Sequence, residues 1–173
     1  MPELPEVETI VRSLSPSVVG QRIASVRLYL PSLLRNTRDS VLKKLRSKRI
    51  LGLSRYGKII IFRCEGNITL LLHLKMTGQL WLCKRDVPRD KHTQFVFSFN
   101  AQTRELRFRD VRKFGFLACY DHDDHFATPE LSRLGPDALQ IGPAAFQKLF
   151  SRRKGRLKSL LLNQKLIAGI GNI

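Results

Sequence analysis

The chain has 173 residues, of which 43% are hydrophobic, and this composition excludes a disordered tail and allows a folded core. Lysine and arginine number 31 against 14 acidic residues, so the formal net charge is +17. This excess predicts a polyanionic partner, and nucleic acid fits better than a membrane because no long basic amphipathic helix is encoded. No apolar run is long enough to cross a bilayer and the acidic start is unlike a signal peptide, so we expect a cytoplasmic protein.

The first fourteen residues predict an amphipathic helix, because apolar side chains recur there at the spacing of one helical face. The residues of that face are Val7, Ile10, Val11 and Leu14. Pro5 suits the first helical turn, where a missing N–H costs nothing. Ser15, Pro16 and Gly20 predict a break after the helix.

The amino terminus itself predicts covalent chemistry. If Met1 is removed, Pro2 becomes the first residue, and its ring nitrogen is a secondary amine that titrates near ~8, well below a lysine. Such an amine attacks an electrophilic carbon and forms a Schiff base, here a charged iminium. Glu3 and Glu6 lie beside it in sequence and are candidates to donate or accept protons. The simpler interpretation is a helix with acidic residues in its first turn, where the helix dipole favours them.

Beyond the first helix, short strands separated by turn signals predict an antiparallel β-sandwich or barrel. A helix is expected in residues 39–50, and Tyr56-Gly57 and Glu65-Gly66-Asn67 mark turns. The predicted strands are residues 22–30, 50–56, 58–64, 67–74, 79–83, 94–99, 105–110 and 114–120.

A change of composition after residue 120 predicts a division of the chain. Residues 1–120 are expected to form the β domain, 121–142 a linker rich in Asp, Pro and Gly, and 143–173 a helical module with helices over 143–150 and 156–166. The cysteines, Cys64, Cys83 and Cys119, form no C-x-x-C pair, so they encode no zinc knuckle. We expect them to be buried thiols in a reducing compartment.

Several single residues allow both a structural and a functional interpretation. Lys58 follows a turn, where it is either a solvated lysine or a phosphate contact and proton donor. His73 and Met76 lie at a strand end, where a histidine is usually structural and a methionine usually fills a core. His92 lies in a charged loop and by itself indicates only solvent exposure.

Two further segments carry the same ambiguity. In DVRKFG, Asp110 and Arg112 suit a local ion pair, and Phe114 suits a core position. Near the end of the chain, Arg153 and Lys158 belong to a basic helix entry suited to phosphate. The glycines of AGIGNI permit a tight turn whose N–H groups can face a phosphate, and Asn172 suits a helix N-cap.

Taken together, these motifs resemble the formamidopyrimidine-DNA glycosylases, which excise oxidised purines. The matching segments run from Pro2 to Ile173. They are MPELPEVE, RYGK, HLKMTG, DVRKFG and the stretch from Gln164 to Ile173. The resemblance implies an α+β fold: a two-layer antiparallel β-sandwich with flanking helices, followed by the start of a helix–two-turn–helix module. Leu4 favours the oxidised-purine branch over the related endonuclease VIII branch, which acts on oxidised pyrimidines.

The resemblance also implies roles for individual residues. Pro2 would be the nucleophile, Glu3 the acid, Glu6 an ordering or proton-relay group, and Lys58 a phosphate contact or proton donor. Met76, Arg112 and Phe114 would be inserted into the duplex where the damaged base has been extruded, with Arg112 reading the orphaned partner base. The residues implied to contact the DNA backbone are His73, His92, Arg153, Lys158 and Asn172.

The implied protein is a monomeric glycosylase and abasic-site lyase of the bacterial cytoplasm, and its partner is double-stranded DNA with oxidised bases or abasic sites. The family continues with more helices and a four-cysteine zinc finger, which these residues lack, so we expect a C-terminally truncated member with no metal or other cofactor. The alternatives are an inactive DNA-binding fragment of such an enzyme, an endonuclease VIII-like glycosylase, and an unrelated basic nucleic-acid-binding β protein.

Overall fold

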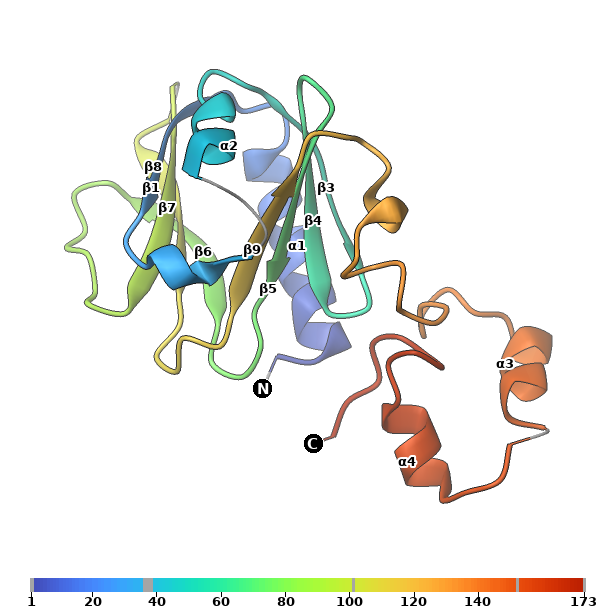
Figure 1. Ribbon diagram of the computed structural model, residues 1–173. Coiled ribbons are helices and arrows are strands. Elements are labelled where there is room, and N and C mark those ends of the chain that lie inside the picture. Colours follow the sequence, from blue (N-terminus) through green and yellow to red (C-terminus); the bar gives the residue numbers. More distant parts are fainter. Residues whose placement is uncertain (1, 36–38, 101, 152, 173) are drawn as a thin grey trace.

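The computed structural model describes residues 2–35, 39–100, 102–151 and 153–172. Two β-sheets face each other and enclose the main hydrophobic core, and the helices α3 (Pro143–Phe150) and α4 (Leu157–Leu162) lie outside the sandwich (Figure 1). The α1 helix (Leu4–Val18) closes one side of the sandwich, where it contacts β3 (Ile50–Tyr56) and β4 (Ile59–Cys64) of one sheet and β6 (Gln79–Lys84) of the other. The predicted α+β sandwich is therefore confirmed.

Each sheet is formed by strands that are distant in sequence. The four-stranded sheet has the order β1 (Ile23–Leu28), β7 (Thr93–Phe99), β8 (Arg104–Arg109), β6 (Gln79–Lys84). The five-stranded sheet has the order β2 (Leu34–Arg35), β9 (Phe116–Tyr120), β5 (Ile68–His73), β4 (Ile59–Cys64), β3 (Ile50–Tyr56). The named strand pairs are antiparallel except β2 with β9, a short parallel pair that the sequence pattern did not predict.

The central strand β7 shows why the sandwich holds together. Phe95, Phe97 and Phe99 alternate along it and point into the core between the sheets, as their spacing predicts. The residues on the opposite face of β7 are buried as well. The segment after β6 is attached to this strand, because Nη2 of Arg85 donates to the carbonyl of Phe99. Arg107 on β8 also holds this segment in place. Arg107 is 4% exposed, and its guanidinium donates to the carbonyls of Val87 and Pro88.

The helices differ from the sequence prediction at their ends. The α1 helix spans Leu4–Val18, so the predicted break at Ser15 and Pro16 is wrong. Pro16 lies inside the helix, in its last turn, and the chain turns at Gly20, the third residue of the predicted break, whose φ is 85°. The remaining helices are α2 (Asp39–Lys44), α3 (Pro143–Phe150) and α4 (Leu157–Leu162), with single 3₁₀ turns η1 (Pro31–Leu33) and η2 (His125–Ala127).

Two of these helices are shorter than predicted. The α2 helix ends at Lys44 because β3 begins at Ile50 and the intervening residues form the turn that leads into it. The α4 helix ends at Leu162 rather than at residue 166, because the Asn163 side chain accepts from the N–H of Lys165 and turns the chain back.

The segment expected to be a linker is attached to the sandwich at several points. The hydroxyl of Tyr56 donates to the carbonyl of Gly135 at 2.9 Å, and the N–H of Gly135 donates to the carbonyl of Gln164. Asp137 forms a parallel bridge with Ala168. The chain between residues 121 and 142 therefore joins the β-sandwich to the last part of the chain through direct hydrogen bonds.

The cysteines are mostly placed as expected. Cys64 and Cys119 are buried, and burial raises the pKa of both thiols to about 12. Cys83 differs, because it is only half-buried on β6, at the edge of its sheet. Within the described ranges, none of the helices has the length and apolar character needed to span a bilayer.

Candidate active site

The predicted catalytic residues meet where α1 begins. Glu3 precedes the helix, is 7% exposed, and its backbone N–H donates to Oε2 of Glu6 at 2.9 Å. Nζ of Lys58 forms an ion pair with Oε2 of Glu3, and both side chains are nearly buried. Pro2 is half-buried directly beside this pair in sequence, while Met1 lies outside the described residues. The candidate nucleophile is therefore followed directly in the chain by a carboxylate that is paired with an ammonium group.

A tight turn between β3 and β4 brings Lys58 to this place. Gly57 has a φ of 54°, a conformation that glycine adopts at little cost, and Lys58 follows it immediately before β4 begins at Ile59. Ile59 pairs with His73 on β5, and His73 pairs with Phe116 on β9. Lys58, the end of β5 and the start of β9 therefore lie together at the same end of the five-stranded sheet.

The last described residues cover the catalytic group. A Cβ atom at Gly171 would lie 1.5 Å from Oε2 of Glu3, and one at Gly169 would lie 2.1 Å from Cδ1 of Leu4. The side chain of Gln164 holds this loop by accepting from the N–H of Gly169 and donating to the carbonyl of Ile170. Asn172, at the end of the loop, is exposed.

A positively charged pocket of about 350 Å³ opens beside Lys58. Arg35, Lys75 and Arg133 line it together with Lys58 and His73, and the guanidinium of Arg35 lies 4.0 Å from the centre of the Phe116 ring. Sequence analysis missed the first three cations, because they come from three distant segments and nothing in their local sequence distinguishes them. Such a concentration of cations suits a phosphate group.

Burial, together with the charge of this pocket, determines the protonation state of His73. Burial, and then the positive charges of Lys75, Lys58 and Arg35, lower the pKa of His73 to about 3. The ring is therefore neutral at pH 7, and Nδ1 accepts from the N–H of Lys75 at 3.0 Å. The remaining ring nitrogen, Nε2, then carries the hydrogen, so His73 can donate to an anion without adding a charge.

We expect His73 to make the fold sensitive to acid. In the unfolded chain it binds a proton below about pH 6.5, whereas in the folded chain it does so only near pH 3, so stability falls as the pH falls between these values. His73→Asn keeps an acceptor for the Lys75 N–H but does not titrate. The free energy of unfolding in urea is measured at pH 7 and at pH 4.5 for both proteins. The decrease between the two pH values is expected to be about 2 kcal/mol smaller in the variant than in the wild type. An equal loss in both proteins would contradict this assignment.

The three residues predicted to enter the duplex lie on two adjacent loops. Nη1 of Arg112 lies 3.0 Å from Sδ of Met76, and its guanidinium carbon lies 4.7 Å from the centre of the Phe114 ring. Met76 is 41% exposed and Phe114 is 51% exposed, so both apolar side chains are accessible at the surface. The structure therefore brings this predicted triad together on the surface.

A buried carboxylate holds the two loops in place. Oδ2 of Asp110 accepts from the N–H of Gly115 at 2.7 Å, and Oδ1 accepts from the N–H of Arg112 at 3.2 Å and from the hydroxyl of Thr77. Asp110 therefore accepts from the backbone N–H of Arg112. The structural interpretation of the DVRKFG motif predicted an ion pair between the two side chains instead. This arrangement also fixes Lys113 in its left-handed conformation, with a φ of 57°.

His92 is held next to the loop that carries Arg112 by hydrogen bonds of its backbone. Asp90 forms an ion pair with Arg109 at 2.5 Å and accepts from the N–H of His92 at 2.8 Å. The carbonyl of His92 in turn accepts from the N–H of Asp110. His92 is half-buried and lies next to the loop that carries Arg112, so it is well placed to extend that surface.

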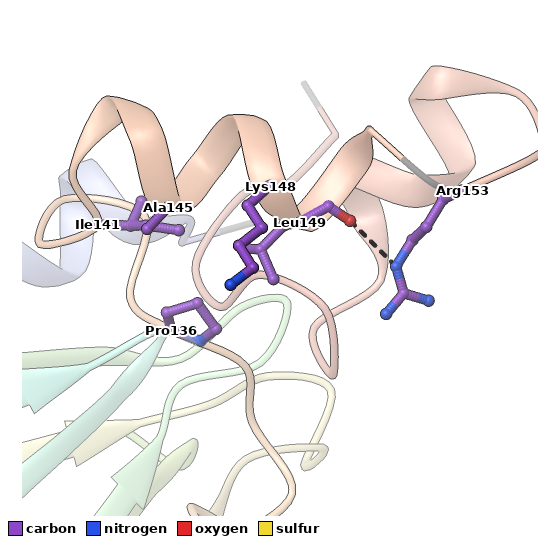
Figure 2. Close-up of a pocket in the computed structure, with 6 residues that line it drawn as sticks. All are labelled: Pro136, Ile141, Ala145, Lys148, Leu149 and Arg153. Carbon is purple, nitrogen blue, oxygen red and sulfur yellow. Dashed lines mark hydrogen bonds between the residues drawn. The ribbon is translucent and has the colours of Figure 1, made fainter.

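The remaining predicted contacts lie in the helical module. Arg153 and Lys158 are both exposed, the first after α3 and the second in the first turn of α4. Figure 2 shows a pocket between α3 and the preceding segment, where Nε of Arg153 donates to the carbonyl of Leu149. Apart from Arg153, no predicted site residue lines this pocket, so it is separate from the catalytic group.

The comparison with known proteins establishes the family. A family model described as the formamidopyrimidine-DNA glycosylase N-terminal domain matches residues 1–117. The chain belongs to the formamidopyrimidine-DNA glycosylase family. The formamidopyrimidine-DNA glycosylase of Lactobacillus gasseri is 38% identical over 175 residues, which cover 100% of this chain and 63% of that protein. The Solibacter usitatus glycosylase is 44% identical, with 100% of this chain and 62% of that protein covered.

Solved structures of this glycosylase family have the same fold. The Lactococcus lactis formamidopyrimidine-DNA glycosylase, non-covalently bound to AP-site-containing DNA, superposes with a TM-score of 0.88 at 34% identity. The match covers 99% of this chain and 66% of that one. The same enzyme with DNA containing N7-benzyl-Fapy-dG gives a TM-score of 0.89 at 35% identity, covering 99% and 64%. The chain thus spans about 63% of the length of curated relatives such as the L. gasseri glycosylase.

Proposed function

We propose that this chain carries the base-excision chemistry of a DNA-repair glycosylase acting on oxidised purines such as 8-oxoguanine and formamidopyrimidines. The main support is that Glu3 and Lys58 form a buried ion pair next to Pro2, at the end of the sandwich where the covering loop closes. The partner is double-stranded DNA with a damaged base or an abasic site, which agrees with the net charge of +17 and with the DNA bound by the L. lactis enzyme.

The proposed chemistry starts with the damaged nucleotide turned out of the duplex. The secondary amine of Pro2 forms a bond to C1′ of the sugar as the bond from C1′ to the base breaks, and the proton that the amine loses goes to the departing base. Glu3 takes a proton from the ammonium of Lys58, with which it is paired, and gives it to the ring oxygen O4′, so the bond from C1′ to O4′ breaks and the nitrogen becomes an iminium. The iminium acidifies the neighbouring C2′–H bond, Glu3, again a carboxylate, takes that proton, and the phosphate leaves from C3′, which cleaves the strand. Glu6 holds the N–H of Glu3 and thereby orders the group.

The other site residues are proposed to bind the duplex. Met76, Arg112 and Phe114 fill the space left by the extruded nucleotide, and Arg112 presents its donors to the orphaned base. His73 and Lys58 hold a phosphate in the charged pocket. The other proposed backbone contacts are His92, Arg153, Lys158 and Asn172. We propose that the chain acts as a monomer and that these residues need no cofactor.

Borohydride trapping tests the function directly, with an abasic duplex and with a duplex that contains 8-oxoguanine. We expect a covalent adduct, located by mass spectrometry on the peptide that begins at Pro2. Pro2→Gln removes the secondary amine and is expected to abolish that adduct, whereas Pro5→Gln makes the same change at the exposed proline of the first helical turn and is expected to trap normally.

The outcomes separate the alternatives. An adduct with the abasic duplex alone would mean that lyase chemistry is present and base excision is not. Excision of oxidised pyrimidines in preference to purines would favour the endonuclease VIII-like alternative. DNA binding with no adduct on either duplex would favour a DNA-binding fragment and refute the catalytic proposal for this chain.

A further inference from the structure

Asp137 is a buried carboxylate that belongs neither to the catalytic group nor to the predicted DNA contacts. It lies in the segment expected to be a linker, yet its side chain is fully buried. Oδ2 accepts from the N–H of Gly57 at 2.7 Å and from Nη1 of Arg55 at 2.5 Å, and Oδ1 accepts from the N–H of Leu139 at 3.0 Å. Moving a carboxylate out of water costs free energy, which is offset only when several donors are placed around it. The donors of Asp137 therefore indicate which parts of the fold this carboxylate holds.

The donors of Asp137 lie on the turn that presents Lys58. Gly57 is the residue immediately before Lys58, and the guanidinium of Arg55 also approaches the carbonyl of Gly57 at 3.4 Å. The N–H and the carbonyl of this one turn residue are thus both held by the Asp137–Arg55 pair. Because Lys58 follows directly, the direction in which its side chain leaves the backbone depends on this turn.

Arg55 extends the connection to the helix that carries the catalytic residues. Its guanidinium is 5% exposed, and Nε forms an ion pair with Oε2 of Glu8 at 2.5 Å. Glu8 lies on α1, about one turn beyond Glu3. Hydrogen bonding to Arg12, followed by Arg55, lowers the pKa of Glu8 against the opposing effect of burial, so Glu8 stays charged at neutral pH. Arg55 thus fixes α1 relative to the turn that carries Lys58.

Asp137 also connects to the loop that covers Glu3. It forms a bridge with Ala168, the N–H of Ala138 donates to the carbonyl of Ala168 at 2.9 Å, and a Cβ atom at Gly57 would lie 3.1 Å from that of Ala168. Three elements therefore meet at this carboxylate: the turn before Lys58, α1 through Arg55, and the segment that reaches Glu3 at Gly171.

We propose that Asp137 is a positioning residue that sets Lys58 against Glu3 by holding the turn at Gly57 and the covering segment together. Its effect on the reaction rests on the proposed glycosylase function, whereas its effect on the placement of Lys58 does not. Asp137→Asn removes the charge that Arg55 requires while it preserves the shape of the side chain. The matched control is Asp123→Asn, the same change at an exposed residue of the same segment.

The first test is competitive acylation of lysines in the free protein, followed by mass spectrometry. In the wild type, Lys58 is 11% exposed and paired with Glu3, so it is expected to label slowly. Asp137→Asn is expected to make Lys58 label several-fold faster with the other lysines unchanged, and Asp123→Asn to leave all of them unchanged. Unchanged labelling of Lys58 in a folded Asp137→Asn variant would overturn the proposal.

The second test is single-turnover trapping with an abasic duplex, together with the affinity for that duplex. The trapping rate of Asp137→Asn is expected to fall by about 10- to 100-fold while the Kd for DNA stays near that of the wild type, because only the reacting groups are misplaced. A wild-type trapping rate would overturn the kinetic part. If the wild-type chain traps nothing, the glycosylase proposal fails, and the labelling result still decides the role of Asp137.

A second variant perturbs the same ion-pair network less than Asp137→Asn does and therefore keeps the test decisive if Asp137→Asn does not fold. Glu8→Gln removes one of the two carboxylates that hold Arg55, at a side chain that is 23% exposed. It is expected to raise the labelling of Lys58 in the same direction as Asp137→Asn, and to a smaller extent. Labelling of Lys58 at the wild-type rate in a folded Glu8→Gln protein would count against the coupling through Arg55.

Discussion

Replacement of Asp110 by alanine is expected to destabilise the protein by about 3 kcal/mol and to separate the two loops that carry Met76, Arg112 and Phe114. The carboxylate is fully buried and accepts from three groups, and the N–H of Gly115 would be left without an acceptor in a buried position. Each buried polar group that loses its partner costs about 1–3 kcal/mol. The free energy of unfolding in urea measures this loss.

Function is expected to suffer as well, because the triad depends on the relative position of the two loops. Thr77 on one loop and Arg112 on the other both bond to Asp110. We expect the affinity of Asp110→Ala for an abasic duplex to fall by about 10-fold, which corresponds to about 1.4 kcal/mol of binding free energy. A gel-shift titration at fixed salt measures it.

Two further variants sharpen this experiment. Asp110→Asn keeps one oxygen acceptor and is expected to lie between the wild type and Asp110→Ala in both measurements. Asp86→Ala makes the same change at an exposed aspartate and is expected to leave both values unchanged. If Asp110→Ala lost stability and kept wild-type affinity, the triad would not depend on the alignment of the loops.

Replacement of Gly171 by alanine is expected to reduce the rate of borohydride trapping by about 100-fold, the cost of displacing a reacting group by about 1 Å. The new methyl group would lie 1.5 Å from Oε2 and 1.9 Å from Cδ of Glu3, so either the loop or the carboxylate must move. The sandwich core does not include Gly171, and we therefore expect the unfolding midpoint to change little.

The same substitution at an unobstructed glycine provides the control. Nothing lies within 4 Å of a Cβ atom at Gly142, where the backbone φ of −74° suits any residue. Gly142→Ala is therefore expected to trap at the wild-type rate. If Gly171→Ala also trapped at the wild-type rate, the covering loop would not lie against Glu3 in solution, and the proposed closure of the site would be wrong.

The sequence determined the features that depend on neighbouring residues. The alternation of Phe95, Phe97 and Phe99 predicted a strand with a buried face, because side chains of a strand point to opposite sides in turn. Turn residues such as Gly57 marked the strand ends correctly. The residues of the triad were singled out by the resemblance of two short motifs, HLKMTG and DVRKFG, to a known family, and the structure brings Met76, Arg112 and Phe114 together.

Only the tertiary structure decided which charged groups are buried and what they hold. Asp137 and Arg55 are 82 positions apart in the chain, so no local pattern reveals that the carboxylate of one neutralises the guanidinium of the other. Arg107 is likewise buried only because the segment that carries Val87 and Pro88, about 20 positions away in the chain, supplies the carbonyls that accept from its guanidinium. A charged side chain is buried without a large free-energy cost only when it has a partner of opposite charge or hydrogen-bonding groups. Which groups become its partners depends on how distant segments pack, and local sequence patterns do not contain that information.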